Sequence, residues 1–322
     1  MPIQTLPPEV VAKIAAGEVI ERPASVVKEL IENSLDAGAT QIIIEVQDGG
    51  VGLVRVADNG SGIPREELGL IGNRHVTSKI STVADLEKIN TLGFRGEALA
   101  SIAAVAELEV LTRTEAETAG TRVVLDKGAI IQQESQARTR GTTVTMRYLF
   151  RYFPARLKFL RSSATESGHI TNLVTQYAFA FPEVKFSLTI DNRPVIRTPG
   201  TGQLRDVVSE IYGIDAARQM LAIDGEDTTL TVNGLISPPS LSRSTKNYLS
   251  FFVNRRWVRS PLLTRAVEQA YTGWLTSDKH PIVIVNLNLP PQDLDVNVHP
   301  RKAEVKFRQE MAVFSAVEKA IK

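Results

Sequence analysis

Three short polar segments, in a fixed order along the chain, constrain its fold more than any other feature. Glu29 and Asn33 lie four residues apart in a helix-like run, Asp58 ends a strand-like run, and Gly93 and Gly96 precede an alanine-rich helical segment. A carboxylate and an amide on one helical face, an acid at a strand end and glycines at a helix start are the parts of a nucleotide pocket. The Walker string G-x-x-x-x-G-K-[ST] does not occur in the sequence, so a pocket of another type is predicted.

The composition is that of a globular protein with about two domains, on a prior of roughly 150 residues per domain. Hydrophobic residues make up 43% of the 322 residues and charged residues 23%. The absence of cysteine excludes disulfides and Cys-based zinc sites. The sequence starts without a secretory signal pattern, and no apolar run approaches the ~20 residues that span a membrane. We therefore expect a soluble, cytoplasmic protein.

Periodicity and turn residues predict an α/β fold with antiparallel strands in the first 200 residues. Two strand-like runs flank the turn signal Asp48-Gly49-Gly50 and predict a hairpin. The elements do not alternate regularly between strand and helix, which argues against a Rossmann fold. Helices are expected near 7–17, 23–36, 83–88, 96–105 and 167–179, and strands near 41–46, 53–57, 109–113, 121–125, 142–147 and 185–190.

Residues 197–202 hold one proline and two glycines and form the predicted linker to a second domain. Beyond it, Ser260 and Pro261 have the cap residue and first-turn proline that begin a helix. Further helices are expected at 204–212 and 311–321, and strands at 230–235, 249–253, 282–289 and near 305.

The polar stripe of the helix 23–36 admits two interpretations. Ser25, Glu29, Asn33 and Asp36 fall within about 80° of arc at 100° per residue. A polar stripe on a lone amphipathic helix usually faces water. In a nucleotide pocket, however, Glu29 would hold a water for attack on a phosphate, and the amide oxygen of Asn33 would suit Mg²⁺.

The other pocket segments are weak signals taken singly. Asp58 would accept a hydrogen bond from an exocyclic amine, with Gly60 and Gly62 allowing a flat base to approach. Gly93 and Gly96 flank a turn into a helix, whose N-terminus offers free N–H groups to phosphates. Two hydroxyls and a cation just upstream, Thr77, Ser78 and Lys79, add to this set. The combination, in this order, predicts a nucleotide site.

Two acid-free stretches, 147–161 and 228–267, concentrate basic residues although the net charge is only +1. Such stretches are able to neutralise nucleic-acid phosphates. Their residues equally suit solvated faces whose acidic partners lie elsewhere in the fold, and the two interpretations stay open. The candidate DNA-binding residues are Arg147, Arg151, Arg156, Lys158, Arg161, Arg243, Arg255, Arg256, Arg259 and Arg265.

The motifs together closely resemble the N-terminal ATPase region of the DNA mismatch-repair MutL family, within the GHKL superfamily that includes gyrase, heat-shock chaperones and histidine kinases. The segment 93–102, Gly-Phe-Arg-Gly-Glu-Ala-Leu-Ala-Ser-Ile, is specific to this family within the superfamily. The other segments that carry the resemblance are 17–39, 58–63, 77–79, 154–156, 158–160 and 295–300. The resemblance covers essentially the whole chain.

The resemblance implies an α/β fold in which a GHKL (Bergerat-type) α+β sandwich ATPase domain over 1–200 precedes a smaller transducer domain over 201–322, with a ribosomal-protein-like β-α-β fold. It implies an N-terminal arm at 1–20 and an ATP lid at about 69–96. Lys302 matches a lysine that reaches the γ-phosphate from the second domain. Nucleotide state would then set the angle between the domains.

The resemblance also implies a role for each pocket residue in binding ATP and Mg²⁺. Glu29 is the implied general base and Asn33 the Mg²⁺ ligand. Asp58 is implied to read the adenine amine, helped by a threonine such as Thr143. The remaining residues implied to contact the nucleotide are Gly60 and Gly62 near the base, and Thr77, Ser78, Lys79, Gly93, Phe94, Arg95, Gly96, Glu97, Ala98 and Leu99 around the phosphates.

For the whole protein, the resemblance implies a slow ATPase that dimerises on binding ATP and couples mismatch recognition to repair. Its implied partners are DNA, a second copy, a MutS-like mismatch sensor and a downstream nuclease or helicase, with nucleoid association during repair. Nothing in this chain indicates a nuclease. Two segments depart from the family pattern: 151–153 reads Arg-Tyr-Phe, and 254–256 reads Asn-Arg-Arg. The alternatives are a topoisomerase ATPase module and a nucleotide-free DNA-binding scaffold.

Overall fold

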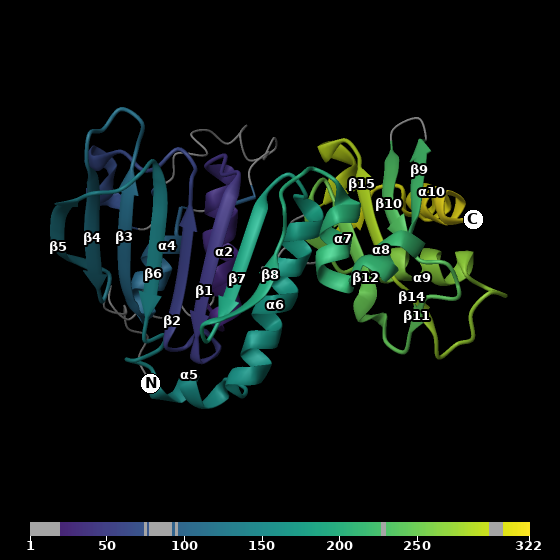
Figure 1. Ribbon diagram of the computed structural model, residues 1–322, viewed down its shortest axis with the longest axis horizontal. Helices are drawn as coiled ribbons and strands as arrows, with labels where there is room; N and C mark the ends of the chain where they lie inside the picture. Colours follow the sequence, from purple (N-terminus) through teal and green to yellow (C-terminus); the bar gives the residue numbers. More distant parts are fainter. Residues whose placement is uncertain (1–19, 74–75, 77–91, 94–95, 227–229, 296–304) are drawn as a thin grey trace, which may run out of the picture. The chain divides into compact units, whose positions relative to one another are not determined.

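The computed structural model describes residues 20–73, 76, 92–93, 96–226, 230–295 and 305–322. The chain forms two compact units, shown in Figure 1. Unit 1 comprises residues 1–174 and 184–200, and unit 2 comprises residues 175–183 and 201–322. Helix α6 (Ser163–Ala180) therefore begins in unit 1 and ends in unit 2.

Unit 1 is built on one eight-stranded sheet with the order β5-β4-β3-β6-β2-β1-β7-β8. Neighbouring strands are antiparallel except β1 and β7, which are parallel. The strands are β1 (Gln41–Gln47), β2 (Leu53–Asp58), β3 (Glu107–Arg113), β4 (Gly120–Asp126), β5 (Ala129–Gln136), β6 (Gly141–Arg147), β7 (Lys185–Ile190) and β8 (Arg193–Arg197). The described helices before α6 are α2 (Pro23–Asp36), α4 (Ala98–Val105) and α5 (Pro154–Phe159), with 3-10 turns at Asp48–Gly50 and Arg65–Leu70.

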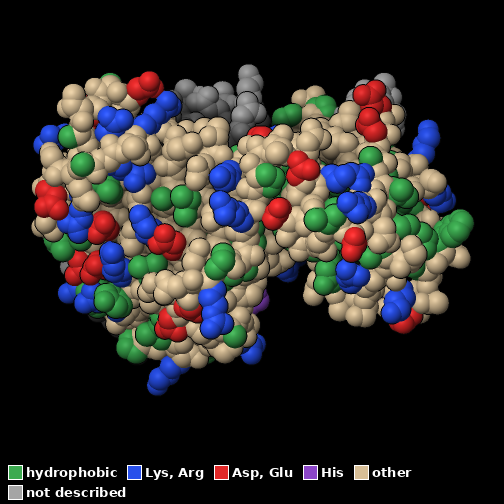
Figure 2. All heavy atoms as spheres, viewed as in Figure 1, with side chains coloured by type: hydrophobic (Ala, Val, Ile, Leu, Met, Phe, Trp, Pro, Cys, Tyr) green, Lys and Arg blue, Asp and Glu red, His purple; other side chains and the backbone are tan. Residues whose placement is uncertain are grey.

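Alternation along the strands divides this sheet into an apolar and a polar face. On β2, Val54 and Val56 are fully or nearly fully buried on the side of α2, where the helix contributes Val27, Leu30 and Ile31. The opposite face carries ion pairs between neighbouring strands, such as Arg55 Nη1 to Glu45 Oε2 at 3.1 Å and Arg122 Nη2 to Glu109 Oε2 at 2.8 Å. Basic and acidic side chains accordingly lie interspersed over unit 1 in Figure 2. The sheet is therefore apolar on the helix side and charged on the other.

The predicted hairpin is confirmed, since β1 and β2 pair antiparallel from Ile42 opposite Asp58 to Gln47 opposite Leu53. Its turn needs glycine, because a Cβ on Gly50 would lie 2.7 Å from the Cβ of Pro23. Sequence periodicity gave no signal for β5, β8 and α5. The side chains of β5 are all exposed, so its sequence carries no apolar alternation.

Unit 2 holds a five-stranded sheet with the order β13-β12-β15-β10-β9. The strands β12 (Leu249–Val253) and β15 (Val283–Asn288) are parallel and are joined through β13 (Arg256–Val258) and α9 (Pro261–Ala270), which confirms the expected β-α-β crossover. The predicted cap is also confirmed: the Leu263 amide donates to Ser260 Oγ at 3.3 Å, and Pro261 is in the first turn.

The remaining elements of unit 2 complete its core. Helix α10 (Glu310–Ile321) packs against α9 and the strands β9 (Leu221–Glu226) and β10 (Thr231–Ile236). Residues fully buried in this core include Leu263, Val267, Val283, Val285 and Val317. The other elements are α7 (Leu204–Tyr212), α8 (Ile214–Gln219), β11 (Ser242–Arg243), β14 (His280–Pro281), β16 (Leu294–Asp295), β17 (Lys306–Phe307) and 3-10 turns at Lys246–Tyr248 and Pro291–Asp293. None of the helices in the described parts of the chain has both the length and the apolar character to cross a membrane.

Candidate nucleotide site

Helix α2 presents the two residues predicted to do chemistry. Pro23 occupies its first turn, where a missing N–H costs nothing, and the chain leaves the helix through Gly38 at φ +70°. Leu30 and Ile31 are buried beneath the helix, whereas Glu29 and Asn33 are partly exposed. The side chain of Glu29 is 27% exposed, so it is neither core nor an open surface group. Water therefore has access to it.

Lys28 links Glu29 to a second, buried acid on the same helix. Its Nζ lies 2.8 Å from Glu32 Oε2 and 3.4 Å from Glu29 Oε1, and Glu32 is only 7% exposed. Burial alone would lower the pKa of Lys28, but the carboxylates of Glu32 and Glu29 outweigh it and raise that pKa. The lysine therefore stays charged and offsets the cost of burying Glu32.

Asp58 ends β2 and is held by donors from three directions. Its Oδ1 accepts hydrogen bonds from the amides of Gly60 at 2.9 Å and Thr142 at 3.1 Å. Its Oδ2 accepts from the hydroxyl of Ser34 on α2 at 2.9 Å. A carboxylate has about four acceptor positions, so three are used and one is left for a ligand. The strand end is thus fixed to the helix that carries Asn33.

Gly60 and Gly62 are required by the close packing of the turn after β2. A Cβ on Gly60 would lie 2.8 Å from the carbonyl oxygen of Ala37, at the end of α2. A Cβ on Gly62, which has φ +78°, would lie 2.2 Å from the carbonyl oxygen of Arg113. The two glycines therefore let the turn contact both α2 and β3. Their expected place beside a base stays a prediction.

The structure does not bring Thr143 to Asp58. Ala57 lies opposite Thr143 across β2 and β6, so the alternation of side chains puts Asp58 and Thr142 together on the α2 face and Thr143 on the other face. The Thr143 hydroxyl there accepts a hydrogen bond from the guanidinium of Arg138. We therefore correct this expectation from Thr143 to Thr142. Sequence alone did not separate two adjacent threonines because the strand register decides between them.

Asp36 anchors the segment that was expected to wrap the phosphates. Its two carboxylate oxygens accept hydrogen bonds from the amides of Leu92 at 3.0 Å and Gly93 at 3.2 Å. Gly96 has φ +62°, and Ala98 begins α4 soon after it. Helix α2 thus holds Gly93 on the same side as its polar stripe. Glu97, Ala98 and Leu99 lie at the start of α4, whereas Thr77, Ser78, Lys79, Phe94, Arg95 and Lys302 lie outside the described residues.

The donor set of α2 fits Mg²⁺ when the ion is shared with a phosphate. Within the described ranges, no three His, Asp or Glu side chains gather in a metal-binding group. Mg²⁺ usually takes only one or two protein oxygens and fills its other positions with water and phosphate oxygens. The single amide of Asn33, partly exposed one turn after Glu29, matches that requirement.

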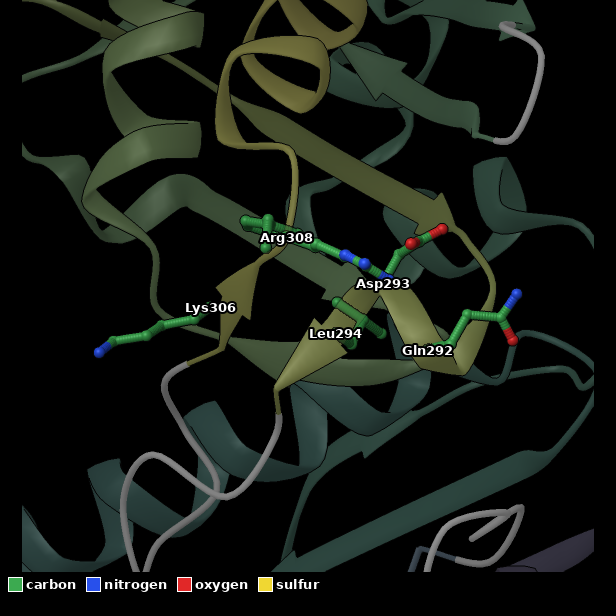
Figure 3. Close-up of a pocket in the computed structure, with 6 residues that line it drawn as sticks. Gln292, Asp293, Leu294, Lys306 and Arg308 are labelled. Atoms are coloured by element: carbon green, nitrogen blue, oxygen red, sulfur yellow. The ribbon is translucent and has the colours of Figure 1, made fainter.

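A shallow pocket of about 330 Å³ lies in unit 2 and contains none of the predicted site residues. It is formed where β16 pairs with β17, with Leu294 opposite Phe307 (Figure 3). The Arg308 amide donates to the carbonyl oxygen of Asp293 at 2.9 Å and extends the pairing of the two strands by one hydrogen bond. The pocket is lined by Gln292, Asp293, Leu294, Lys306, Phe307 and Arg308. In the sequence, β16 precedes and β17 follows the segment that includes Lys302.

Several of the basic DNA-binding candidates have partners within the fold. Arg147 Nη1 lies 3.5 Å from Glu109, and Arg151 Nη1 lies 3.6 Å from Glu107. Arg156 packs its guanidinium over two phenylalanine rings, with Nη1 buried. Lys158 and Arg161 are exposed, and no described acid pairs with them. The solvated-face interpretation therefore holds for part of the first stretch and leaves these two free.

The departure at Asn254 and Arg255 has a structural reason. Both residues have positive φ, of 47° and 66°, in the turn between β12 and β13 where glycine is favoured. Arg255 lies 4.9 Å over the ring of Phe181 and its Nη1 lies 2.6 Å from Glu183. These contacts within unit 2 offset the backbone strain.

Two family models match the chain in the order of its units. One, described as histidine kinase-, DNA gyrase B- and HSP90-like ATPase, matches residues 20–147. The other, described as DNA mismatch repair protein, C-terminal domain, matches residues 208–322. The first match includes every residue of the Asp58 cluster, which consists of Asp58 and its donors Ser34, Gly60 and Thr142.

Curated relatives match the chain almost from end to end. DNA mismatch repair protein MutL of Halothermothrix orenii is 45% identical over 99% of this chain and 50% of its own length. The MutL protein of Geobacillus kaustophilus is 46% identical over 96% of this chain and 49% of its own length. DNA mismatch repair protein HexB of Streptococcus pneumoniae is 44% identical over 98% of this chain and 48% of its own length. The chain spans about half the length of these relatives.

Solved structures share the fold across both units. The N-terminal domain of a DNA repair protein is 28% identical with a TM-score of 0.82, covering 96% of each chain. The Aquifex aeolicus MutL ATPase domain complexed with ADP is 27% identical with a TM-score of 0.67, covering 94% of this chain and 98% of that one. The B-subunit of DNA gyrase from Myxococcus xanthus, at 14% identity and a TM-score of 0.62 over 98% of this chain and 95% of that one, shows the fold alone. The expected GHKL ATPase fold is confirmed.

Proposed function

Since this chain is MutL-like along essentially its whole length but spans only about half of those relatives, we propose that it is the ATP-binding and ATP-hydrolysing portion of a DNA mismatch repair protein. In this proposal nucleotide binding drives dimerisation and a change of conformation. That change passes mismatch recognition on to downstream repair factors.

The observation that carries the proposal is the fixed Asp58 carboxylate beside the polar stripe of α2. Ser34 donates to Asp58 and directly follows Asn33 in the helix, so the base-reading acid and the metal-binding amide belong to one rigid unit. One acceptor position of Asp58 remains for the exocyclic amine of adenine. A solved relative with 27% identity holds ADP, which supports this assignment.

The proposed chemistry is attack of water on the γ-phosphate. Glu29 accepts the proton of the attacking water as general base, and its partial exposure allows that water to reach it. Asn33 would hold Mg²⁺, which when bound neutralises the charge on the phosphate oxygens. Because the side chain of Glu29 is only partly shielded from solvent, hydrolysis is expected to be slow.

The phosphates are proposed to lie against the segment that Asp36 anchors. Among the described residues, the first turn of α4 presents backbone N–H groups to an anion. The two hydrogen bonds from Leu92 and Gly93 to Asp36 fix the start of that segment to α2. The sequence resemblance supports further proposed phosphate contacts by Thr77, Ser78, Lys79 and Lys302.

DNA, a second copy of the chain, a MutS-like sensor and a downstream nuclease or helicase are the proposed partners of the whole protein. Among the described candidates, the residues best placed to meet phosphates are exposed and form no ion pair with a described acid: Lys158, Arg161, Arg259 and Arg265. The topoisomerase alternative has less support, since the gyrase likeness is one of fold at 14% identity.

The proposal is tested by phosphate release from ATP with Mg²⁺ or with EDTA, together with light scattering with and without a non-hydrolysable ATP analogue. We expect slow Mg²⁺-dependent hydrolysis and a doubling of mass with the analogue. Hydrolysis without any change of mass would remove dimerisation of this portion from the proposal. Absence of both hydrolysis and any change of mass with the analogue would favour the scaffold alternative.

A further inference from the structure

Behind the Asp58 cluster, two buried threonine hydroxyls meet on neighbouring strands. Thr112 on β3 lies opposite Thr142 on β6, and their Oγ1 atoms are 3.0 Å apart. Thr112 is 1% exposed and Thr142 is 9% exposed. Both lie on the α2 face of the sheet, together with Asp58, because the three residues are aligned across β3, β6 and β2. A pair of hydroxyls in this position has to share its protons with little help from solvent.

One backbone amide restricts how the protons of this pair are shared. The amide of Ile63, in the turn after Gly62, donates to Thr112 Oγ1 at 2.8 Å. Thr112 is therefore an acceptor on that side, and its own proton goes either to Thr142 Oγ1 at 3.0 Å or to the carbonyl oxygen of Gly141 at 3.3 Å. The 3.0 Å contact between the two hydroxyls can be made with either of them as the donor. When Thr112 is the donor, Thr142 accepts from it and the proton of Thr142 is left to donate to a ligand.

This direction of donation matters because of the acid beside it. The amide of Thr142 donates to Asp58 Oδ1 at 3.1 Å, and Asp58 has one acceptor position left. A ligand thus meets an acceptor next to a hydroxyl donor. Adenine presents the complementary pair, an exocyclic amine next to the ring acceptor N1. Guanine presents a carbonyl next to an N–H, which is the reverse pattern.

We propose that Thr112 is a positioning residue that selects adenine: it orients the hydroxyl of Thr142 as a donor to N1, directly or through one water. The inference rests on the proposed ATP site and adds a residue to it that does not touch the base. Two successive hydrogen bonds, from Ile63 N–H to Thr112 and from Thr112 to Thr142, thereby connect the turn after β2 to the base-reading group.

The role of Thr112 is tested by coupling a mutation to a single atom of the ligand. The dissociation constants of ADP and 1-deaza-ADP, in which a C–H replaces N1, are measured for the wild-type chain and for Thr112→Val. In the wild type the loss of N1 is expected to weaken binding about 10-fold, as for one hydrogen bond. In Thr112→Val, where Thr142 loses its donor, we expect this penalty to fall below about 3-fold. Thr112→Ser, which keeps the hydroxyl, should retain the full penalty.

Thr121→Val is the matched control, because Thr121 is 4% exposed and lies opposite Thr112 on the next strand, β4. It should keep the wild-type penalty for 1-deaza-ADP. An unchanged penalty in Thr112→Val, or an equal reduction in Thr121→Val, would overturn the role of Thr112 and leave the ATP site standing. A wild-type chain that binds no ADP would overturn both. If Thr112→Val does not fold, Thr112→Ala removes the same hydroxyl and is judged by the same penalties.

Discussion

The hydroxyl of Ser34 lies 2.9 Å from Oδ2 of Asp58, and this contact joins the last turn of α2 to the end of β2. The same hydroxyl is 3.0 Å from the carbonyl oxygen of Leu30, but it has only one proton. A carboxylate is a stronger acceptor than a carbonyl oxygen, so the Ser34 hydroxyl donates its hydrogen bond to Asp58. Helix and strand are therefore coupled at the point where a base would be read.

Replacing Ser34 by alanine should weaken nucleotide binding without unfolding the chain. A hydrogen bond to a charged group contributes about 1.5–3 kcal/mol, so a loss of roughly 10- to 100-fold in ADP affinity is expected. Calorimetric titration of Ser34→Ala measures it. Ser101→Ala is the control, since Ser101 is 1% exposed on α4. Equal losses in the two variants would show a general packing defect instead.

Replacing Glu29 by alanine should separate binding from turnover. A general base typically contributes roughly 10²- to 10⁴-fold to the rate, so hydrolysis should fall by that factor while ATP affinity stays close to wild type. Ser25→Ala, on the same stripe one turn earlier, should hydrolyse ATP normally. Lost binding in Glu29→Ala would assign that residue a structural role.

The two adjacent threonines of β6 should behave differently. Thr142→Val removes a hydroxyl on the face of Asp58 and should weaken ADP binding by about 10-fold. Thr143→Val removes the acceptor that Arg138 uses on the opposite face and should leave ADP binding within about 2-fold. Calorimetric titration of ADP into both variants shows which of the two threonines lies on the nucleotide side. A stronger effect at Thr143 would contradict the assignment of Thr142.

The sequence patterns predicted the polar stripe of α2, the hairpin β1–β2 and the fold class because these depend on local periodicity and turn residues. They did not predict the roles of Ser34 and Asp36. Ser34 falls on the side of the helix with the apolar residues, and only the position of β2 shows that its hydroxyl meets Asp58. Asp36 contacts amides 56 and 57 residues away, a separation that no local pattern encodes. Contacts between residues far apart in the sequence could not be predicted, because they depend on how the helix and the strands pack.

The charged face of the sheet should give a specific pH dependence of stability. Burial alone would raise the pKa of Glu109, but Arg122 and Arg147 outweigh it and hold that pKa below its ordinary value of 4.5. A carboxyl with a lowered pKa in the folded state stabilises the fold above its unfolded pKa, and this contribution is lost as pH falls through the folded value.

Glu109→Gln should therefore lower the free energy of unfolding by about 1 kcal/mol at pH 7, a figure that allows for solvent screening. The difference from wild type should shrink below pH 4.5. Urea unfolding from pH 7 to pH 3 measures it. Glu45→Gln, at the pair of Glu45 and Arg55 whose side chains are 42% and 43% exposed, should have a smaller effect. A constant difference across that pH range would refute the ion-pair origin.

The central claim is that Asp58 reads the base of a bound adenine nucleotide. Its most direct test is calorimetric titration of a non-hydrolysable ATP analogue into the wild-type chain and into Asp58→Asn, with circular dichroism to verify that both are folded. The amide oxygen of asparagine can still accept from Gly60 and Thr142, but its NH2 group places a donor where the carboxylate offers an acceptor to Ser34 and to the ligand. We predict saturable binding by the wild type and a loss of at least about 100-fold in Asp58→Asn. Equal affinities in two folded proteins would contradict the account.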